Sequence, residues 1–263
     1  MDTLGTFLVF LADSIAFFSI YLMLNISLNI ERGLAGIPNF GLLLSYAAGA
    51  YIVGSLGGRI ALYITGVSFQ GDPVSDSTLV IMSVNPLLEH DFVKSLIYLL
   101  MLLAIGSLFG AFIGLLQVGP VIRLREDYLA ITLLALAEVL NEIGRVYKPF
   151  INGPMGVSVP DPFLWAGRDL RFYVASSEIA LVAVLIFIYA EYLSRSPLGR
   201  VFRAIRENEI AAMSLGKSIA RYRAIAMSLG SAIAGLAGSL YTLYQGSITP
   251  TLQRFHWTFL PWL

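Results

Sequence analysis

Long apolar runs constrain this chain more than any other feature. A helix needs about 20 mostly apolar residues to cross the roughly 30 Å hydrocarbon core of a bilayer. Of the 263 residues, 57% are hydrophobic and 13% are charged, whereas soluble domains carry about 25% charged residues. The sequence therefore predicts an all-α, polytopic membrane bundle of about six spans. The expected spans are residues 6–30, 34–66, 92–117, 128–144, 172–193 and 222–244.

The second of these segments departs from a simple span. Residues 34–66 are too long and too rich in glycine for one straight helix, and Pro38 lies near their start, in the sequence GIPNFG. Proline removes a backbone donor and interrupts a helix. We therefore expect a discontinuous or re-entrant segment at this position.

The charges between the spans predict an orientation in the plasma or inner membrane. Segment 194–223 carries seven basic side chains, whereas segment 67–91 carries four acidic ones and no Lys or Arg. Short loops rich in Lys and Arg stay on the cytoplasmic side. Segment 194–223 is therefore expected in the cytoplasm, and alternation of the spans places the N-terminus outside. No basic residue precedes the first apolar run, so we interpret it as a retained span and not a secretory signal.

The composition excludes several kinds of chemistry. The chain has no cysteine and only two histidines, which lie far apart in the sequence. Thiolate metal sites and cysteine nucleophiles are therefore excluded, and a histidine-based metal site is not expected. The formal net charge is zero, which provides no global basic field for nucleic acid. We expect no metal site, no catalytic residues and no nucleic-acid partner.

A strongly charged stretch, FRAIRENEIAAMSLGKSIARYR at 202–223, separates the last two spans. Pro197 ends the preceding span, and the apolar residues Val201, Phe202 and Ile205 then predict a short helix. Small side chains further along would let another protein approach the backbone closely, with the flanking charges setting register. The residues alone leave an alternative, a solvated basic loop attracted to anionic lipid.

The run SPLGRVFRAIRENEIAAMSLG resembles the cytoplasmic loop of permease subunits of branched-chain amino acid ABC transporters, in the paralogue whose loop reads LGRxxxAIRENExAAxxLG. Segments 33–41, 123–140 and 152–157 also resemble that family, so the likeness covers roughly residues 20–263 in order. The loop resembles the EAAxxxG loop of other ABC importer permeases more distantly, because Ile210 separates Glu209 from the alanines. In the family the chain continues after the last span, and we expect this chain to lack those C-terminal spans.

The resemblance implies one transmembrane permease domain over residues 1–263, with 194–223 as the loop that couples it to ATPases. It implies two ATP-binding subunits that hold ATP and Mg, a paralogous permease subunit and an extracytoplasmic substrate-binding protein, while this chain binds no cofactor. The implied substrates are branched-chain or other hydrophobic amino acids, with urea or a short-chain amide as the alternative. The implied ATPase contact consists of Arg203, Arg206, Glu207, Asn208, Glu209, Ala211, Ala212 and Gly216.

Polar residues within the expected spans are candidates for the substrate path. Spacings of three and four place Glu138, Asn141 and Glu142 on one helical face, where they line the path or hold helices together through hydrogen bonds. Backbone amides near Asn39 and Gly41 could meet a substrate carboxylate at the N-terminus of a half-helix, or could simply begin a helix at the inner interface. A channel or secondary transporter without ATPases would suit these features but leaves the charged loop unexplained.

Overall fold

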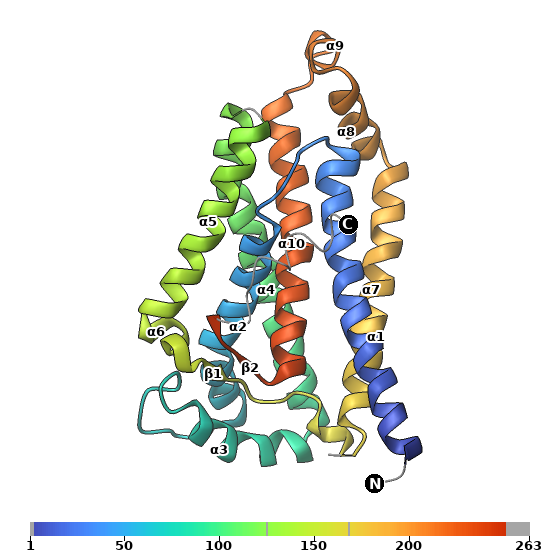
Figure 1. The fold of residues 1–263 in the computed structure, drawn as a ribbon. Coiled ribbons are helices and arrows are strands. Elements are labelled where there is room, and N and C mark those ends of the chain that lie inside the picture. The colour runs from blue at the N-terminus through green and yellow to red at the C-terminus, as the bar shows by residue number, and fades with distance from the viewer. Residues whose placement is uncertain (1–2, 125, 168, 251–263) are drawn as a thin grey trace.

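The computed structural model describes residues 3–124, 126–167 and 169–250. Long helices lie side by side in a single bundle (Figure 1). They are α1 (Thr3–Leu28), α2 (Leu42–Thr65), α4 (Phe92–Arg123), α5 (Glu126–Val146), α7 (Arg171–Arg195) and α10 (Ile219–Gln245). The predicted all-α membrane bundle is confirmed. The expectation about missing C-terminal spans concerns residues outside the described part of the chain.

Among the described residues, five helices are long and apolar enough to cross a membrane. They comprise residues 5–34, where α1 continues into the π-helix η1 (Asn29–Leu34), together with α2, α4, α7 and α10. The predicted span at 128–144 forms helix α5 but is not one of these five. Glu138, Glu142 and Arg145 interrupt its apolar run, so α5 differs from its neighbours in polarity and not in helical structure.

The second apolar region is discontinuous, as predicted. After η1, residues 35–41 are not helical and turn back into the bundle, so that α2 begins well inside it (Figure 1). We call residues 35–41 the re-entrant segment. Its Ala35, Ile37, Pro38 and Asn39 are buried. A chain without regular hydrogen bonding is tolerated at membrane depth only where protein covers it.

Small residues let three helices pack closely at the centre of the bundle. A Cβ added to Gly49 of α2 would overlap the Gly235 carbonyl of α10, and one added to Gly110 of α4 would lie 2.9 Å from the Gly235 Cα. In lipid, such close backbone approach is a main source of helix association. We call α2, α4 and α10 the packed centre.

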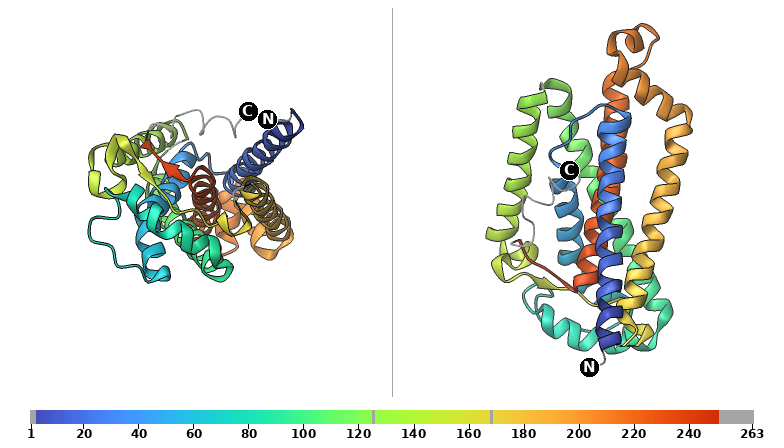
Figure 2. Two further views of the ribbon diagram at one scale, coloured as in Figure 1. Left: turned by 90° about the horizontal axis from the view of Figure 1, so that it is seen from below. Right: turned by 45° about the vertical axis from the view of Figure 1, so that its right-hand side comes forward.

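Short elements close the two ends of the bundle (Figures 1 and 2). One end, where α1 begins, carries α3 (Ser77–His90), α6 (Lys148–Ile151), the 3-10 turns η2 (Gly153–Met155) and η3 (Leu164–Ala166), and strands β1 (Val157–Ser158) and β2 (Ser247–Ile248). The two strands pair antiparallel, with Val157 opposite Ile248. The other end carries α8 (Pro197–Glu207) and α9 (Glu209–Ser214). The start of α1 and the charged loop therefore lie at opposite ends of the bundle.

Candidate functional site

Helix α8 packs directly on the re-entrant segment. The Ser196 hydroxyl accepts a hydrogen bond from the Gly199 amide at 3.2 Å, a side-chain cap that starts the helix just after α7 ends. Phe202 and Ile205 then face inward and are almost fully buried. Phe202 belongs to one apolar cluster with Ile37 of the re-entrant segment. The apolar stripe predicted for this helix is therefore the face that holds it to the bundle.

Two arginines of the predicted ATPase contact are engaged within the chain. Arg203 donates to the Ser194 carbonyl at the end of α7, at 2.9 Å. Arg206 donates to the Gly33 carbonyl in η1. A Cβ added to Gly36 would lie 2.7 Å from the Arg206 Cγ, so this arginine rests directly on the backbone of the re-entrant segment. Both side chains tie α8 to the neighbouring elements.

Polar contacts shape the short helix α9 that follows. The Asn208 side-chain oxygen accepts from the Ala211 amide at 3.0 Å and caps the helix. Glu209 forms an ion pair with Arg223 of α10. Gly216 ends the turn with a φ of 74°, a left-handed conformation that favours glycine. Ala212 is buried beneath the helix. These predicted contact residues therefore determine the shape of residues 209–216, which we call the α9 tip.

The outer surface of the α9 tip is apolar. Ile210 is 74% exposed, Met213 53% and Leu215 78%, and the tip is the part of the molecule farthest along the bundle axis (Figure 1). Glu207 and Ala211 are also exposed. The sequence patterns did not single out these three large apolar residues. The available signal was large apolar side chains at 210, 213 and 215 within an otherwise small and polar stretch.

Asn39 and Gly41, two of the substrate-path candidates, bind each other. The Asn39 side-chain oxygen accepts from the Gly41 amide at 2.7 Å, and Gly41 is the N-cap residue of α2. The Asn39 side-chain nitrogen donates to the Glu31 carboxylate at 2.7 Å. Both polar ends of Asn39 are therefore used to fix the start of α2.

Glu138, Asn141 and Glu142 lie on α5, where it passes α2. The Tyr51 hydroxyl of α2 donates to Asn141 at 3.1 Å, and Glu142 pairs with Arg145 at 3.2 Å. Glu138 and Glu142 are both exposed. Gly41 meets α5 at Leu133, eight residues before Asn141, which corresponds to roughly 12 Å along the helix. The two groups of candidates therefore share the seam between α2 and α5 but lie at different depths.

A buried acid that the sequence patterns did not single out, Glu31, joins three elements. It is fully buried, and it accepts from Asn39 and, at 3.3 Å, from the Ser231 hydroxyl of α10. A Cβ added to Gly230 would lie 2.5 Å from its carboxylate, so the glycine provides the space it occupies. A buried polar group needs such partners. The signal in the sequence was an acid at the end of a long apolar run.

These surfaces have features that suit recognition and movement. Across the residues that the structure describes, no three His, Cys, Asp or Glu side chains lie together as a metal site. The prominent features are an exposed apolar tip, a helix that binds it to the bundle and a buried polar link into the start of α2. Such an arrangement suits docking of another protein and transfer of its movement into the membrane domain.

Comparison with known proteins also indicates a membrane transport protein. The family model described as branched-chain amino acid transport system / permease component matches residues 10–263. The chain is 35% identical over 247 residues to the probable branched-chain amino acid transport permease protein LivM of Methanocaldococcus jannaschii, covering 94% of this chain and 71% of the relative. It is 30% identical over 260 residues to the high-affinity branched-chain amino acid transport system permease protein LivM of Escherichia coli K12, covering 90% of this chain and 53% of the relative.

A more limited match extends to another transport system. Over 148 residues the chain is 31% identical to the autoinducer 2 import system permease protein LsrC of Klebsiella pneumoniae, covering 55% of this chain and 40% of the relative. No solved structure matches the chain. The chain spans about half the length of its E. coli relative. The resemblance found in the loop and its neighbouring segments is confirmed at the level of the family, which consists of transport permeases and not of enzymes. The chain belongs to the family of permease components of branched-chain amino acid transport systems.

Proposed function

We propose that this chain is the membrane-spanning permease subunit of an ATP-driven importer of branched-chain or other hydrophobic amino acids. The observation that carries the proposal is the α9 tip, which presents Ile210, Met213 and Leu215 outward while α8 binds the bundle. The printed names of the LivM relatives support the substrate class. Urea or a short-chain amide remains the alternative substrate.

The proposed complex assigns the chemistry to other subunits. Two ATP-binding subunits hold ATP and Mg, a paralogous permease completes the membrane domain, and an extracytoplasmic binding protein delivers the substrate. This chain contributes no catalytic residue and binds no cofactor. The α9 tip lies in the cytoplasm and the start of α1 outside, an orientation supported by the basic residues of 194–223 and the acidic residues of 67–91.

Docking of an ATP-binding subunit on the α9 tip is consistent with the exposed surface. Contiguous exposed apolar side chains mark interaction sites, and interface energy is concentrated in a few such groups at the centre of a contact. Ala211 lies between Ile210 and Met213 and leaves room for close approach of a partner. Glu207, just before the tip, and the pair that Glu209 of the tip forms with Arg223 supply the charged rim.

Movement of α8 reaches the membrane part of the chain through the re-entrant segment. Arg206 holds the Gly33 carbonyl, and Phe202 packs in one cluster with Ala35 and Ile37. A displaced α8 therefore carries residues 33–37 with it, because Phe202 is buried in the same cluster as Ala35 and Ile37 and Arg206 is hydrogen-bonded to Gly33. Coupling between distant sites requires such a continuous set of packed groups.

The same contacts continue into α2 and α5. The Ile37 amide donates to the Glu31 carbonyl at 2.8 Å, and the Glu31 carboxylate holds Asn39, which holds the Gly41 amide at the start of α2. Helix α2 then presents Tyr51 to Asn141 of α5. We propose that this series of contacts transmits movement of the α9 tip to the seam between α2 and α5.

We place the substrate path along the exposed acidic face of α5. Glu138 and Glu142 are exposed on a helix at the edge of the bundle that packs against α2 and α4 (Figure 1). An acid facing hydrocarbon is costly and generally faces protein or water instead. The proposed paralogous permease would cover this face and enclose an aqueous path between the two subunits.

Association with ATP-binding subunits tests the proposal. Met213→Asp places a charge on the α9 tip, and Met155→Asp is the matched control because Met155, in the turn η2 that belongs to the opposite end, is 86% exposed. We expect Met213→Asp to reduce co-purification of ATP-binding subunits at least about tenfold and the control to leave it unchanged. Equal co-purification of both variants, or uptake that does not require ATP, would instead support a channel or secondary transporter.

A further inference from the structure

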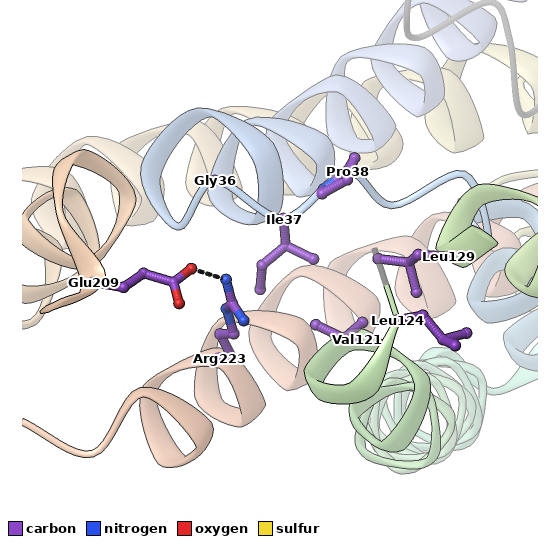
Figure 3. Close-up of a pocket in the computed structure, with 8 residues that line it drawn as sticks. All are labelled: Gly36, Ile37, Pro38, Val121, Leu124, Leu129, Glu209 and Arg223. Carbon is purple, nitrogen blue, oxygen red and sulfur yellow. Dashed lines mark hydrogen bonds and ion pairs between the residues drawn. The ribbon is translucent and has the colours of Figure 1, made fainter. Parts of the chain in front are cut away.

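A cavity of about 280 Å³ lies between the α9 tip and the re-entrant segment (Figure 3). It opens where the end of α4, the start of α5 and the start of α10 come together. Its walls include the apolar residues Ile37, Val121, Leu124 and Leu129 and the ion pair of Glu209 with Arg223. This volume lies just below the roughly 300–1,000 Å³ typical of ligand pockets, so the cavity suits one small molecule.

The walls of this cavity are divided by polarity. Glu209 and Arg223 lie at one side, Val121, Leu124 and Leu129 lie at the opposite side, and Ile37 lies between them (Figure 3). Val121 and Leu129 are buried members of the apolar cluster under α8. A ligand that fits must therefore carry charge at one end and an apolar group at the other.

The ion pair retains hydrogen-bonding capacity for such a ligand. One terminal nitrogen of Arg223 binds Glu209, and the Arg223 side chain keeps 21% of its surface exposed, so its guanidinium can donate to a ligand as well. The Glu209 side chain keeps 45% of its surface exposed, so its carboxylate can accept further donors.

We infer that this cavity binds one apolar α-amino acid in its zwitterionic form. The ligand's carboxylate binds Arg223, its ammonium group binds Glu209, and its side chain packs against Val121 and Leu129. An α-amino acid carries its two charges on neighbouring groups, so it lies antiparallel across a contact ion pair and satisfies both partners at once. The cytoplasmic position of the cavity rests on the proposed function, whereas the fit of the zwitterion rests on the residues that line the cavity.

Occupancy of the cavity restrains the α9 tip. The ligand contacts Glu209 of α9 and Ile37 of the re-entrant segment, which move together during the proposed coupling, and also Arg223 of α10, past which they move. An imported amino acid that accumulates in the cytoplasm therefore slows ATP hydrolysis by its own transporter. The site is a product-feedback site, distinct from the path along α5.

Binding of labelled L-leucine to the full chain, purified with its associated subunits into lipid nanodiscs without ATP or binding protein, tests the inference. Unlabelled leucine should compete, whereas leucinamide, which lacks the carboxylate, and 4-methylpentanoate, which lacks the ammonium group, should each compete more than about tenfold more weakly. Serine should not compete. Absence of saturable binding, or equal competition by the two analogues and leucine, would overturn the inference.

Two variants separate this cavity from other sites. Arg223→Gln removes the carboxylate partner, and Leu124→Trp fills the cavity from its 38% exposed rim while leaving the ion pair intact. Both should abolish binding, and the exposed neighbour Arg221→Gln should retain it. Leucine should also inhibit ATP hydrolysis by the unmodified complex but not by Leu124→Trp. Unchanged leucine binding in Leu124→Trp would show that leucine binds elsewhere and would overturn the inference. If the unmodified chain binds leucine but no ATP-binding subunit co-purifies with it, only the proposed function is contradicted.

Discussion

The packed centre and the α9 tip place small residues in different surroundings. In the centre, Gly49, Gly110 and Gly235 bring three helices into backbone contact, and no large side chain could take their place. At the tip, Ala211 is exposed beside Ile210 and Met213, and nothing in the described part of the chain covers it. Small residues bring backbones together within the chain at the packed centre, and in the proposed complex they would allow close approach of a partner at the tip.

The packed centre should be the region most sensitive to added volume. Gly49→Leu would drive its side chain into the Gly235 carbonyl, and overpacking of this kind costs about 1–3 kcal/mol or more. We expect loss of folded protein, measured as the yield of monodisperse chain after detergent extraction. Gly119→Leu in α4 is the control, since a Cβ there has nothing within 4 Å. Equal yields of the two variants would contradict the close packing described here.

Substitution of Glu31 should reduce the coupling between the α9 tip and the membrane helices more than it reduces subunit docking or folding. Glu31→Ala removes the acceptor for Asn39 and Ser231, so we expect transport per ATP hydrolysed to fall about tenfold while ATP-binding subunits still co-purify. Glu31→Gln keeps an acceptor oxygen and should recover part of the coupling. A parallel loss of co-purification in Glu31→Ala would show a role in folding only.

Asn208 should have a moderate effect confined to the tip. Asn208→Ala removes the side-chain cap of α9, and loss of such a cap costs about 0.5–2 kcal/mol. Hydrogen exchange of the α9 amides should therefore become faster, while exchange in α10 remains unchanged. Ser214→Ala, which removes a hydroxyl bound to the Ile210 carbonyl on the same helix, is the control and should leave the exchange nearly unaltered.

An exposed ion pair at the end of α7, outside both regions, should show the smallest effect. Arg195 lies at the end of α7 and binds Glu191 at 2.7 Å, but its side chain is 79% exposed. Exposed pairs of this spacing contribute about 0.3–0.5 kcal/mol. Arg195→Gln should therefore leave the thermal unfolding temperature nearly unchanged. Any small difference from the unmodified chain should become smaller at high salt. A large shift would mean that the pair does more than the structure indicates.

Much of the fold could be predicted from the sequence, because membrane spans depend on composition and length. The apolar runs predicted the helices, and Pro38 with its glycines predicted the break before α2. Glu138, Glu142 and Arg145 showed in the sequence that α5 contains charged residues. That α5 is more polar than the five candidate spans became clear only when all the long helices were compared.

The candidate site was less predictable, because it depends on which side chains face inward. Arg203 and Arg206 read as surface charges in the loop, but both bind backbone carbonyls of the bundle. Ile210, Met213 and Leu215 read as ordinary helix residues, but α9 buries Ala212 and leaves them exposed. Glu31 gained its partners from residues 8 and 200 positions away, and sequence periodicity does not report such distant contacts.

Docking of an ATP-binding subunit on the α9 tip is the central claim, and cross-linking tests it most directly. The chain has no cysteine, so Ile210→Cys introduces a single thiol to which a photoactivated cross-linker can be attached in native membranes. We predict that this variant cross-links to an ATP-binding subunit and that Met155→Cys, at the opposite end of the bundle, does not. Cross-linking of Met155→Cys with equal yield, or none from Ile210→Cys in a transport-competent complex, would contradict the account.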